Sequence, residues 1–348
     1  MARSPKIPDS LFTGSLFPEM PVHPSIERAA RSELSARTRV FRERSAAGAS
    51  QTTDEFSPLR AADLSDDNHL RFFSIGSGSS GNCAYLGNNE NGLLIDAGVD
   101  TFKVENALRS NGISIDSVKG IIVTHDHGDH IRYLYALARR HKHLGVYCTP
   151  RTFGGIMRRH SISRRLKDYH RPIYKEFPFK VGNLEVTAFD VSHDGTDNCG
   201  YFISDSAGHT FAIATDLGCI TPRVDHYLRL ARHIVIESNY DAGLLSVGPY
   251  PEYLKARIKA PNGHLDNVVT ARFVSEVAAL GNLSHVFLCH LSHDNNRPDI
   301  ARDTIVRALC DAGLGPVGDA SMSADSRDCR LQVAVLPRFD ASPLYHLY

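Results

Sequence analysis

The chain has 348 residues, enough for one large domain or two small ones, and 42% of them are hydrophobic, as in proteins that bury a core. Its 39 basic and 39 acidic residues give a formal net charge of zero, so the overall charge indicates neither a nucleic-acid nor an anionic-membrane partner. No run approaches the roughly 18 apolar residues of a membrane span, and the N-terminus lacks the apolar core of a signal peptide, so we predict a cytoplasmic protein that does not contact a membrane.

The first 68 residues differ from the rest in composition. They are rich in Ser, Pro, Ala and Arg, show no strand alternation, and contain one plausible amphipathic helix at 26–41. We predict that residues 1–68 form a disordered or weakly structured extension, that 69–338 form the folded domain, and that 339–348 form a C-terminal tail.

From residue 70 onward, short apolar runs bounded by Gly and Asn indicate strands, and helical patterns lie between them. The expected strands are LRFFSIG, CAYLG, GLLIDAG, GIIVT, LEVTAFDVS, CGYFISD, TFAIATD, HIVIES, HVFLC and RLQVAVL. The expected helices cover 102–108, a segment that begins near Asp129, 221–230, 267–280 and 298–311. This mixture predicts an α/β fold with two mixed β-sheets flanked by helices.

Metal-binding side chains gather in GIIVTHDHGDH, residues 120–130. His125 and His127 leave a buried strand two residues apart, so both side chains point the same way and can share one metal. Asp129 and His130 turn into the following helix and can address a second metal. A lone histidine at a strand end is a weak signal, but four such ligands within six residues predict a metal centre.

The segment from residue 131 to 175 carries twelve Lys and Arg residues against one acid, Asp168. Such a block is a candidate phosphate-binding surface. It can equally be a solvated helix face, because cations such as Arg139 and Arg140 are favourable near a helix C-terminus.

The pattern H-x-H-x-D-H after an apolar strand resembles the signature of the metallo-β-lactamase superfamily, and the resemblance covers nearly the whole core. It implies the αββα sandwich of that superfamily. It also implies that Asp96 in LLIDAG supports the histidines from behind without binding a metal itself. His193 in FDVSHDG would complete the first metal site, and Asp216 in FAIATDLG would bridge both metals.

The last ligand that the resemblance implies is a histidine after a final buried strand. HVFLCHLSHDNN offers two, and we favour His290 over His293 because His290 ends the apolar run. One metal would then be held by His125, His127, His193 and Asp216, and the other by Asp129, His130, Asp216 and His290. These nitrogen and oxygen ligands suit zinc, with manganese as the alternative.

Two metals in such a site would share a water and deliver it as a metal-bridging hydroxide at neutral pH. Asp129 would orient or deprotonate that water. Glu237 in IVIES, with His264 in GHLDN, resembles the proton relay of the ribonuclease Z group, which favours a phosphodiester substrate. The chain has no space for the inserted domain of ribonuclease J and no long arm of the kind with which ribonuclease Z grips tRNA.

Three motifs in the same order resemble the WalJ/YycJ-like group of metal-dependent exonucleases. They are SGSSGN at 77–82, GHLDN at 263–267 and HLSHDNN at 290–296. Their polar residues are candidate substrate-binding groups, namely Ser79, Ser80, Asn82, Asn295 and Asn296. The serine- and glycine-rich run can also be a simple tight turn, and the two later asparagines can simply begin a helix.

The sequence therefore predicts a binuclear phosphodiesterase, most simply a 5′-to-3′ DNA exonuclease, with DNA favoured over RNA. A hydrolase of a small phosphodiester, a thioester or a lactone is the alternative, because the same metals serve all of these reactions. A non-catalytic metal-binding protein is a third reading, which the complete ligand set disfavours.

Overall fold

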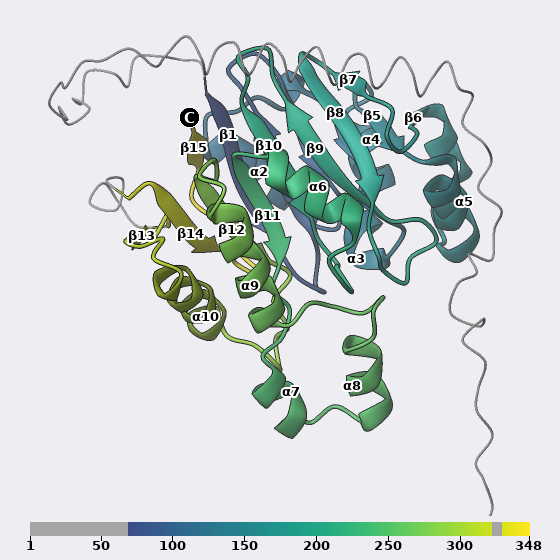
Figure 1. Cartoon of the computed structure of the whole chain (residues 1–348). Helices are drawn as coiled ribbons and strands as arrows, with labels where there is room; N and C mark the ends of the chain where they lie inside the picture. The colour runs from purple at the N-terminus through teal and green to yellow at the C-terminus, as the bar shows by residue number, and fades with distance from the viewer. Residues whose placement is uncertain (1–68, 322–328) are drawn as a thin grey trace, which may run out of the picture. The chain divides into compact units, whose positions relative to one another are not determined.

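Two β-sheets form the centre of the molecule, and helices cover their outer faces (Figure 1). The computed structural model describes residues 69–321 and 329–348. The predicted extension at 1–68, with its helix at 26–41, lies outside the described residues. Within the described part, the predicted α/β sandwich is confirmed.

The first sheet has seven strands in the order β15-β1-β2-β3-β4-β5-β6. They are β1 Leu70–Gly76, β2 Cys83–Gly87, β3 Gly92–Ile95, β4 Val118–Ile122, β5 Gly145–Cys148, β6 His170–Pro172 and β15 Tyr345–Leu347. Strand β15 comes from the segment predicted as a tail and pairs antiparallel with β1. The last residues of the chain therefore contribute to the sheet, while the domain boundary at 338 stays a prediction.

The second sheet has eight strands in the order β13-β14-β12-β11-β10-β9-β8-β7. They are β7 Phe179–Val181, β8 Leu184–Asp190, β9 Cys199–Ser204, β10 Thr210–Ala214, β11 His233–Glu237, β12 His285–Cys289, β13 Val317–Gly318 and β14 Leu331–Val335. Strands β10, β11, β12 and β14 are parallel, so their carboxyl ends lie at one edge of the sheet.

Helices pack on both outer faces because each carries a stripe of buried apolar residues. In α6, for example, Thr221 caps the N-terminus by accepting a hydrogen bond from the Val224 amide at 3.2 Å, and Val224 and Leu228 lie buried one turn apart. Helices α2, α4 and α5 share an apolar cluster with the first sheet, and α6, α9 and α10 share one with the second. The bounds are α2 Thr101–Ser110, α3 Gly128–Ile131, α4 Leu134–Arg140, α5 Pro150–Arg159, α6 Pro222–Leu230, α7 Ala242–Val247, α8 Glu252–Ile258, α9 Asn267–Ala278 and α10 Pro298–Asp311.

A third apolar cluster fills the space between the two sheets. Phe72 of β1 lies at its centre, with ring centroids 5.0 Å from Phe211 and 4.9 Å from Phe287 of the opposite sheet. Aromatic contacts of this kind fix how the two sheets face each other, and so fix the relative positions of the loops at their edge.

Several elements were not predicted from the sequence. They include α5, with two glycines in its middle, the short strands β5, β6 and β7, and helices α7 and α8, which stand apart from the layers in Figure 1. Among the described residues, no helix has the length and apolarity needed to cross a bilayer.

Candidate metal centre

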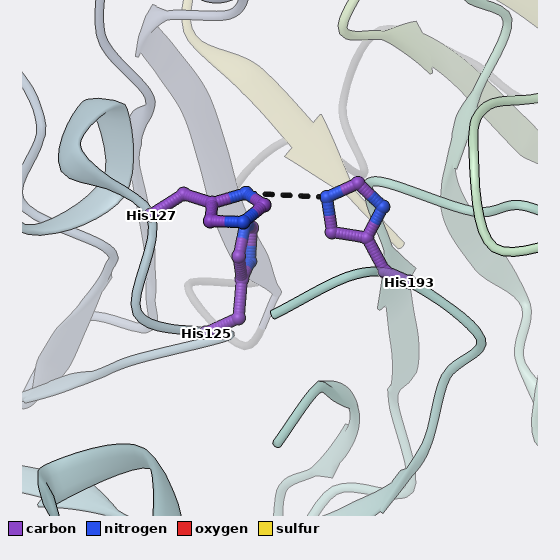
Figure 2. Close-up of side chains that lie close together, drawn as sticks. All are labelled: His125, His127 and His193. Atoms are coloured by element: carbon purple, nitrogen blue, oxygen red, sulfur yellow. Dashed lines mark hydrogen bonds between the residues drawn. The ribbon is translucent and has the colours of Figure 1, made fainter. Parts of the chain in front are cut away.

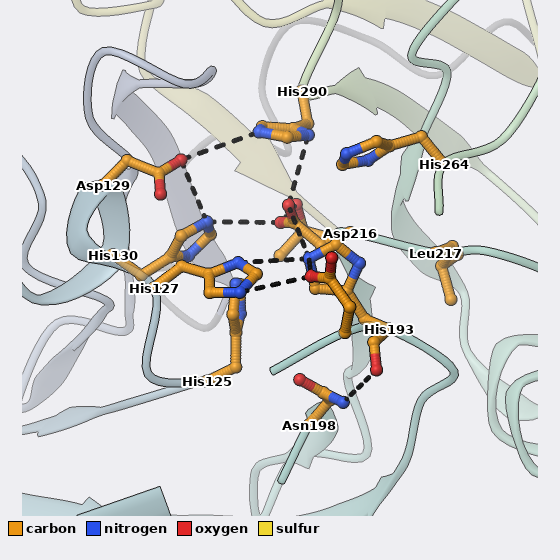
Figure 3. Close-up of polar contacts among 12 residues, drawn as sticks. His125, His127, Asp129, His130, His193, Asn198, Asp216, Leu217, His264 and His290 are labelled. Carbon is orange, nitrogen blue, oxygen red and sulfur yellow. Dashed lines mark hydrogen bonds and ion pairs between the residues drawn. The ribbon is translucent and has the colours of Figure 1, made fainter. Parts of the chain in front are cut away.

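Every residue predicted as a metal ligand follows a β-strand at the same edge of the two sheets (Figure 3). The turn between β4 and α3 carries His125 and His127, and α3 itself carries Asp129 and His130. His193 follows β8, Asp216 follows β10, and His290 follows β12. The structure brings all seven side chains together.

His125, His127 and His193 form one group (Figure 2). Nε2 of His193 lies 3.3 Å from Nδ1 of His127. The His125 ring centroid lies 4.6 Å from that of His127 and 5.0 Å from that of His193. Each residue thus offers a nitrogen to one common point, which is the arrangement that a metal with histidine ligands needs.

Asp129, His130 and His290 form a second group, and Asp216 lies between the two groups. The Asp216 carboxylate is 3.3 Å from Nε2 of His130, 3.4 Å from Nδ1 of His290 and 3.7 Å from Nε2 of His193. A carboxylate in this place has oxygens directed at both groups, as a bridging ligand requires.

The backbone is strained at three residues of this centre. Asp96, Asp216 and His290 have φ angles of 63°, 54° and 54°, in the left-handed region that residues other than glycine rarely adopt. At His290 this conformation is held by a hydrogen bond from its amide to Oγ of Ser77, 3.0 Å away. Strain of this kind persists only where the surrounding structure fixes it, and it concentrates at functional sites.

Asp96 holds His130 from behind. One Asp96 oxygen lies 2.7 Å from Nδ1 of His130, and the carboxylate also accepts hydrogen bonds from the amide and the hydroxyl of Thr124, each at 2.8 Å. This contact directs Nε2 of His130 towards Asp216 and Asp129. A carboxylate behind a histidine is the usual arrangement around protein-bound metals.

Asn82 and Gly98 fix the position of Asp129. The Asn82 amide donates to the carbonyl oxygen of Asp129 at 2.8 Å, and its side-chain amide donates to the Asp129 carboxylate at 3.1 Å. A Cβ on Gly98 would lie 1.5 Å from the same carbonyl oxygen, so only glycine allows this approach. Asn82 is 7% exposed, which suits holding Asp129 better than binding substrate.

Glu237 and His264 lie together beside His290. Oε1 of Glu237 lies 2.8 Å from Nδ1 of His264 and 2.8 Å from Nδ1 of His290, and Oε2 accepts the amides of Leu217 and Leu265. Burial lowers the pKa of His264, but the Glu237 carboxylate raises that pKa by more, so the pKa of His264 lies above its usual value. Glu237 is completely buried, while 22% of the His264 side chain is exposed, so His264 is the member of the pair that can reach a substrate.

Burial and neighbouring charges shift the pKa values of the ligands in different directions. Burial and the neighbouring His130 hold the pKa of His125 well below its usual value, so His125 is neutral. Burial raises the pKa of Asp216, but His290 and His130 lower it more, so the carboxyl is ionised. Burial lowers the pKa of His130 and of His290, but Asp216 raises both more, that of His290 to about 10, so these two histidines would release a proton on binding a metal. Neutral imidazole and ionised carboxylate are the forms that bind metals.

Unpartnered atoms show that the residues fit a metal. Nε2 of His125 and Nε2 of His290 are both buried and make no hydrogen bond within the described chain, and Nε2 of His290 has only the Asp129 carboxylate 3.8 Å away. A buried nitrogen without a partner costs about 1–3 kcal/mol, and coordination to a metal would remove that cost. The centre contains one such atom in each of its two groups. The seven cysteines are free and do not take part in these groups.

The predicted substrate-binding residues differ in their surroundings. Ser79 and Ser80 are exposed in the loop after β1. Asn295 is completely buried, and Asn296 is 5% exposed with its side chain bonded to Ser238 and Asn267. The two asparagines therefore hold the loop before α10, a geometry that does not favour contact with a substrate.

Two supports of the centre escaped the sequence analysis. The completely buried Asp126 lies between His125 and His127 and accepts hydrogen bonds from the amide and hydroxyl of Thr196. Asp194 lies 3.2 Å from Nε2 of His127 and accepts hydrogen bonds from Nε and one Nη of Arg257 in α8. HDHGDH and HDG contain these acids, but only the fold brings Thr196 and Arg257 to them. His293, the alternative to His290, is exposed and pairs with Asp294.

Comparison with known proteins gives consistent relatives. A model of the β-lactamase superfamily domain matches residues 91–290. Exodeoxyribonuclease YycJ of Bacillus anthracis is 35% identical over 257 residues, which cover 72% of this chain and 93% of the relative. Exodeoxyribonuclease WalJ of Streptococcus pneumoniae is 31% identical over 249 residues, covering 71% and 90%. The metallo-β-lactamase fold protein YhfI from Bacillus subtilis has a TM-score of 0.57 at 15% identity, over 80% of this chain and all of YhfI, a likeness of fold.

Proposed function

Because the chain belongs to the β-lactamase superfamily and is a metal-dependent hydrolase, we propose that it is a DNA exonuclease that degrades a strand from its 5′ end. The observation that carries this proposal is the complete set of seven ligands at one edge of the fold, in a chain that is 35% identical to an exodeoxyribonuclease over nearly all of that relative.

The two groups of ligands support a pair of metals. His125, His127 and His193 would hold one, Asp129, His130 and His290 the other, and Asp216 both. Their nitrogen and oxygen atoms favour zinc, with manganese as the alternative. When bound, such a pair of divalent ions supplies Lewis acidity towards the phosphate and lowers the pKa of a bound water towards neutrality.

The chain's own residues orient the reaction around that pair. Asn82 donates to Oδ2 of Asp129, which faces His130 and His290, so the other oxygen, Oδ1, would align a water and accept its proton. Glu237 engages Nδ1 of His264, which leaves Nε2 as the nitrogen that can give a proton to the departing oxygen. Burial raises the pKa of Glu237, but His264 and His290 lower it more, so the carboxylate is ionised. The Leu217 and Leu265 amides fix its position, so His264 keeps one orientation.

A basic surface beside the centre supports a polyanionic substrate. We use this term for the exposed residues Arg158, Arg159, Arg164, Arg165 and Lys167, at the end of α5 and just after it. His160 lies 2.6 Å from the carbonyl oxygen of Asp126, and Arg159 lies 3.6 Å from the Asp126 carboxylate. The basic surface therefore adjoins the turn that carries His125 and His127, where it can bind phosphates of a strand.

A substrate panel tests the proposal. Full-length protein supplied with Zn²⁺ or Mn²⁺ would be given linear DNA, closed circular DNA, linear RNA, bis(p-nitrophenyl) phosphate and a thioester, with His127→Ala as the control. We expect linear DNA to be degraded, circular DNA to stay intact, and the variant to lose the activity. Hydrolysis of only the small phosphodiester or the thioester would overturn the proposal in favour of a small-molecule hydrolase, and cleavage of circular DNA would indicate an endonuclease.

A further inference from the structure

A pocket of about 340 Å³ opens beside the loop that supports the metal centre at Gly98. Its walls come from the loop after β1, the start of α2, the start of α4 and the segment after β14. The residues that matter here are Ser80, Lys103, Arg132, Tyr133, Arg338 and Phe339. Its volume lies near the lower end of the roughly 300–1,000 Å³ of small-molecule sites.

The pocket and the metal centre share their walls. Gly98 lines the pocket and is in backbone contact with Asp129, as its close approach to the carbonyl oxygen shows. Arg132 follows α3 directly and donates to the carbonyl oxygen of Ser80 at 3.1 Å. Arg338 donates to the carbonyl oxygen of Leu291, the residue after His290. A molecule in the pocket therefore lies next to the backbone that carries Asp129 and close to Leu291, the residue after His290.

The charge of the pocket suits a phosphate monoester. Lys103, Arg132 and Arg338 line it, against one acid, Asp100. Asp100 is the N-cap of α2 and accepts the amide of Phe102 at 2.9 Å, so its carboxylate is already engaged. The positive excess of two matches a terminal phosphate, which carries about −1.5 to −2 at pH 7, better than a diester with a single charge.

Aromatic side chains complete the pocket. Phe339 is 57% exposed, and the guanidinium carbon of Arg338 lies 5.8 Å from the centre of its ring. Tyr133 lines the same pocket. A nucleobase can stack on an aromatic ring irrespective of its identity, so the pocket offers a surface for a base next to a phosphate site.

We propose that this pocket binds the terminal nucleotide of the DNA strand, with its 5′-phosphate among Lys103, Arg132 and Arg338 and its base against Phe339. The assignment rests on the proposed nuclease function. It places the bond to be cut one nucleotide from the end, because the pocket adjoins the backbone that carries Asp129 and lies close to Leu291. Hydrolysis breaks the bond between phosphorus and the 3′ oxygen of the first nucleotide, and the oxygen of water is added to that phosphorus.

This step leaves a new 5′-phosphate on the shortened strand. The first nucleotide leaves with its original 5′-phosphate and a new 3′-hydroxyl, which takes the proton. The second nucleotide keeps the attacked phosphate as a new 5′-phosphate. Each cycle thus creates the terminal group that the pocket binds in the next cycle, and only the first cut depends on how the substrate's end was made.

The first test compares matched DNA strands that carry a 5′-phosphate or a 5′-hydroxyl, cut by full-length, metal-loaded protein. We expect kcat/KM for the first cut to be at least about tenfold higher with the 5′-phosphate. Lys103→Gln and Arg132→Gln would reduce that ratio to below about threefold, mainly through KM. Arg109→Gln, the same type of change at the other end of α2, would keep the parent's ratio.

The assignment would be overturned if the parent cut 5′-phosphate and 5′-hydroxyl strands equally. It would also be overturned if the Lys103 and Arg132 variants lost the same fraction of kcat/KM on both kinds of strand. Binding of deoxythymidine 5′-monophosphate to the full-length protein in the presence of chelator separates the pocket from the activity. We expect it to bind more tightly than thymidine and to weaken at least about fivefold in Lys103→Gln. Unchanged binding in that variant would refute the pocket even if DNA is degraded, whereas pocket binding without DNA degradation would refute only the nuclease function.

Discussion

At the scale of single residues, the metal centre is a set of side chains that depend on one another. Four of its ligands were predictable because they are contiguous in HDHGDH, and local spacing alone puts them on one turn. His193, Asp216 and His290 are 63 or more positions beyond the last of these, so only resemblance to known proteins identified them. Asp126 and Asp194 were missed because their partners, Thr196 and Arg257, are brought to them by the fold.

The contact between Asp96 and His130 gives a prediction for metal affinity. Asp96→Asn keeps the size of the side chain but weakens its hold on Nδ1 of His130, so we expect the affinity for metal to fall about 10- to 100-fold, measured by competition with a chromogenic chelator. Asp205→Asn is the matched control, because Asp205 contacts Nδ1 of His209 at 2.9 Å in the turn between β9 and β10. Equal affinity in the parent and Asp96→Asn would contradict the role of Asp96.

At the scale of elements, the centre depends on how closely the β3–α2 loop approaches α3. Strands and long helices were predictable from apolar runs and their periodicity, as β10, β11, β12 and α9 illustrate. Helix α5 was not, because Gly154 and Gly155 interrupt the pattern, and β6 was not, because three exposed or half-buried residues carry no alternation. The basic block itself was visible in the sequence, but its position beside Asp126 was not.

The close contact at Gly98 makes that residue a sensitive position. Gly98→Ala would force a Cβ into the carbonyl oxygen of Asp129, so we expect the free energy of unfolding to fall by about 2 kcal/mol and the bound metal to decrease. Gly128→Ala is the comparison, since a Cβ there meets only a carbon of His160 at 3.8 Å. Denaturant unfolding and metal analysis measure both effects. Similar results for the two variants would show that the approach at Gly98 is not restrictive.

The basic surface at the end of α5 predicts a change in salt dependence. If Arg158 contacts a phosphate, Arg158→Gln should weaken DNA binding uniformly across sequences and reduce the slope of log K against log salt by about 1. Arg307→Gln, an equivalent change at an exposed arginine of α10 on the second sheet, should leave the slope unchanged. Fluorescence anisotropy in a salt series measures the slope, and equal slopes for the parent and Arg158→Gln would remove Arg158 from the DNA path.

At the scale of the whole molecule, the αββα arrangement was predictable because two sets of strands alternate with amphipathic helices. The last strand of the first sheet was not predictable, since β15 has only three residues and pairs with β1 across more than 270 residues. Long-range pairing of such short strands is decided by the packed core, here by Phe72 and the rings around it, and not by local preference.

The pair of histidines at the start of β11 and β12 predicts how stability depends on pH. Burial, with nearby Arg232, lowers the pKa of His285 to about 4, and its Nδ1 lies 3.1 Å from that of the completely buried His233. Above about pH 6.5, His285 is neutral in both states and stability is complete. As the pH falls towards 4, only the unfolded chain takes up the proton, so the free energy of unfolding should fall by up to about 3 kcal/mol.

Denaturant unfolding between pH 7 and 4 measures this loss. His285→Gln should reduce the dependence but not abolish it, because burial also holds the pKa of His233 well below its usual value, while His226→Gln at an exposed position of α6 should leave the dependence unchanged. A parent whose stability is constant over this range would contradict the burial of a neutral His285.

The central claim is that this metal centre removes nucleotides from the 5′ end of DNA, and a time course with end-labelled duplex DNA tests it most directly. With Zn²⁺ or Mn²⁺, the 5′ label should appear as mononucleotide from the first time point, while the 3′ label stays in strands that shorten gradually. His127→Ala should release neither label. Early release of the 3′ label, or digestion that persists in chelator or in the variant, would contradict the account.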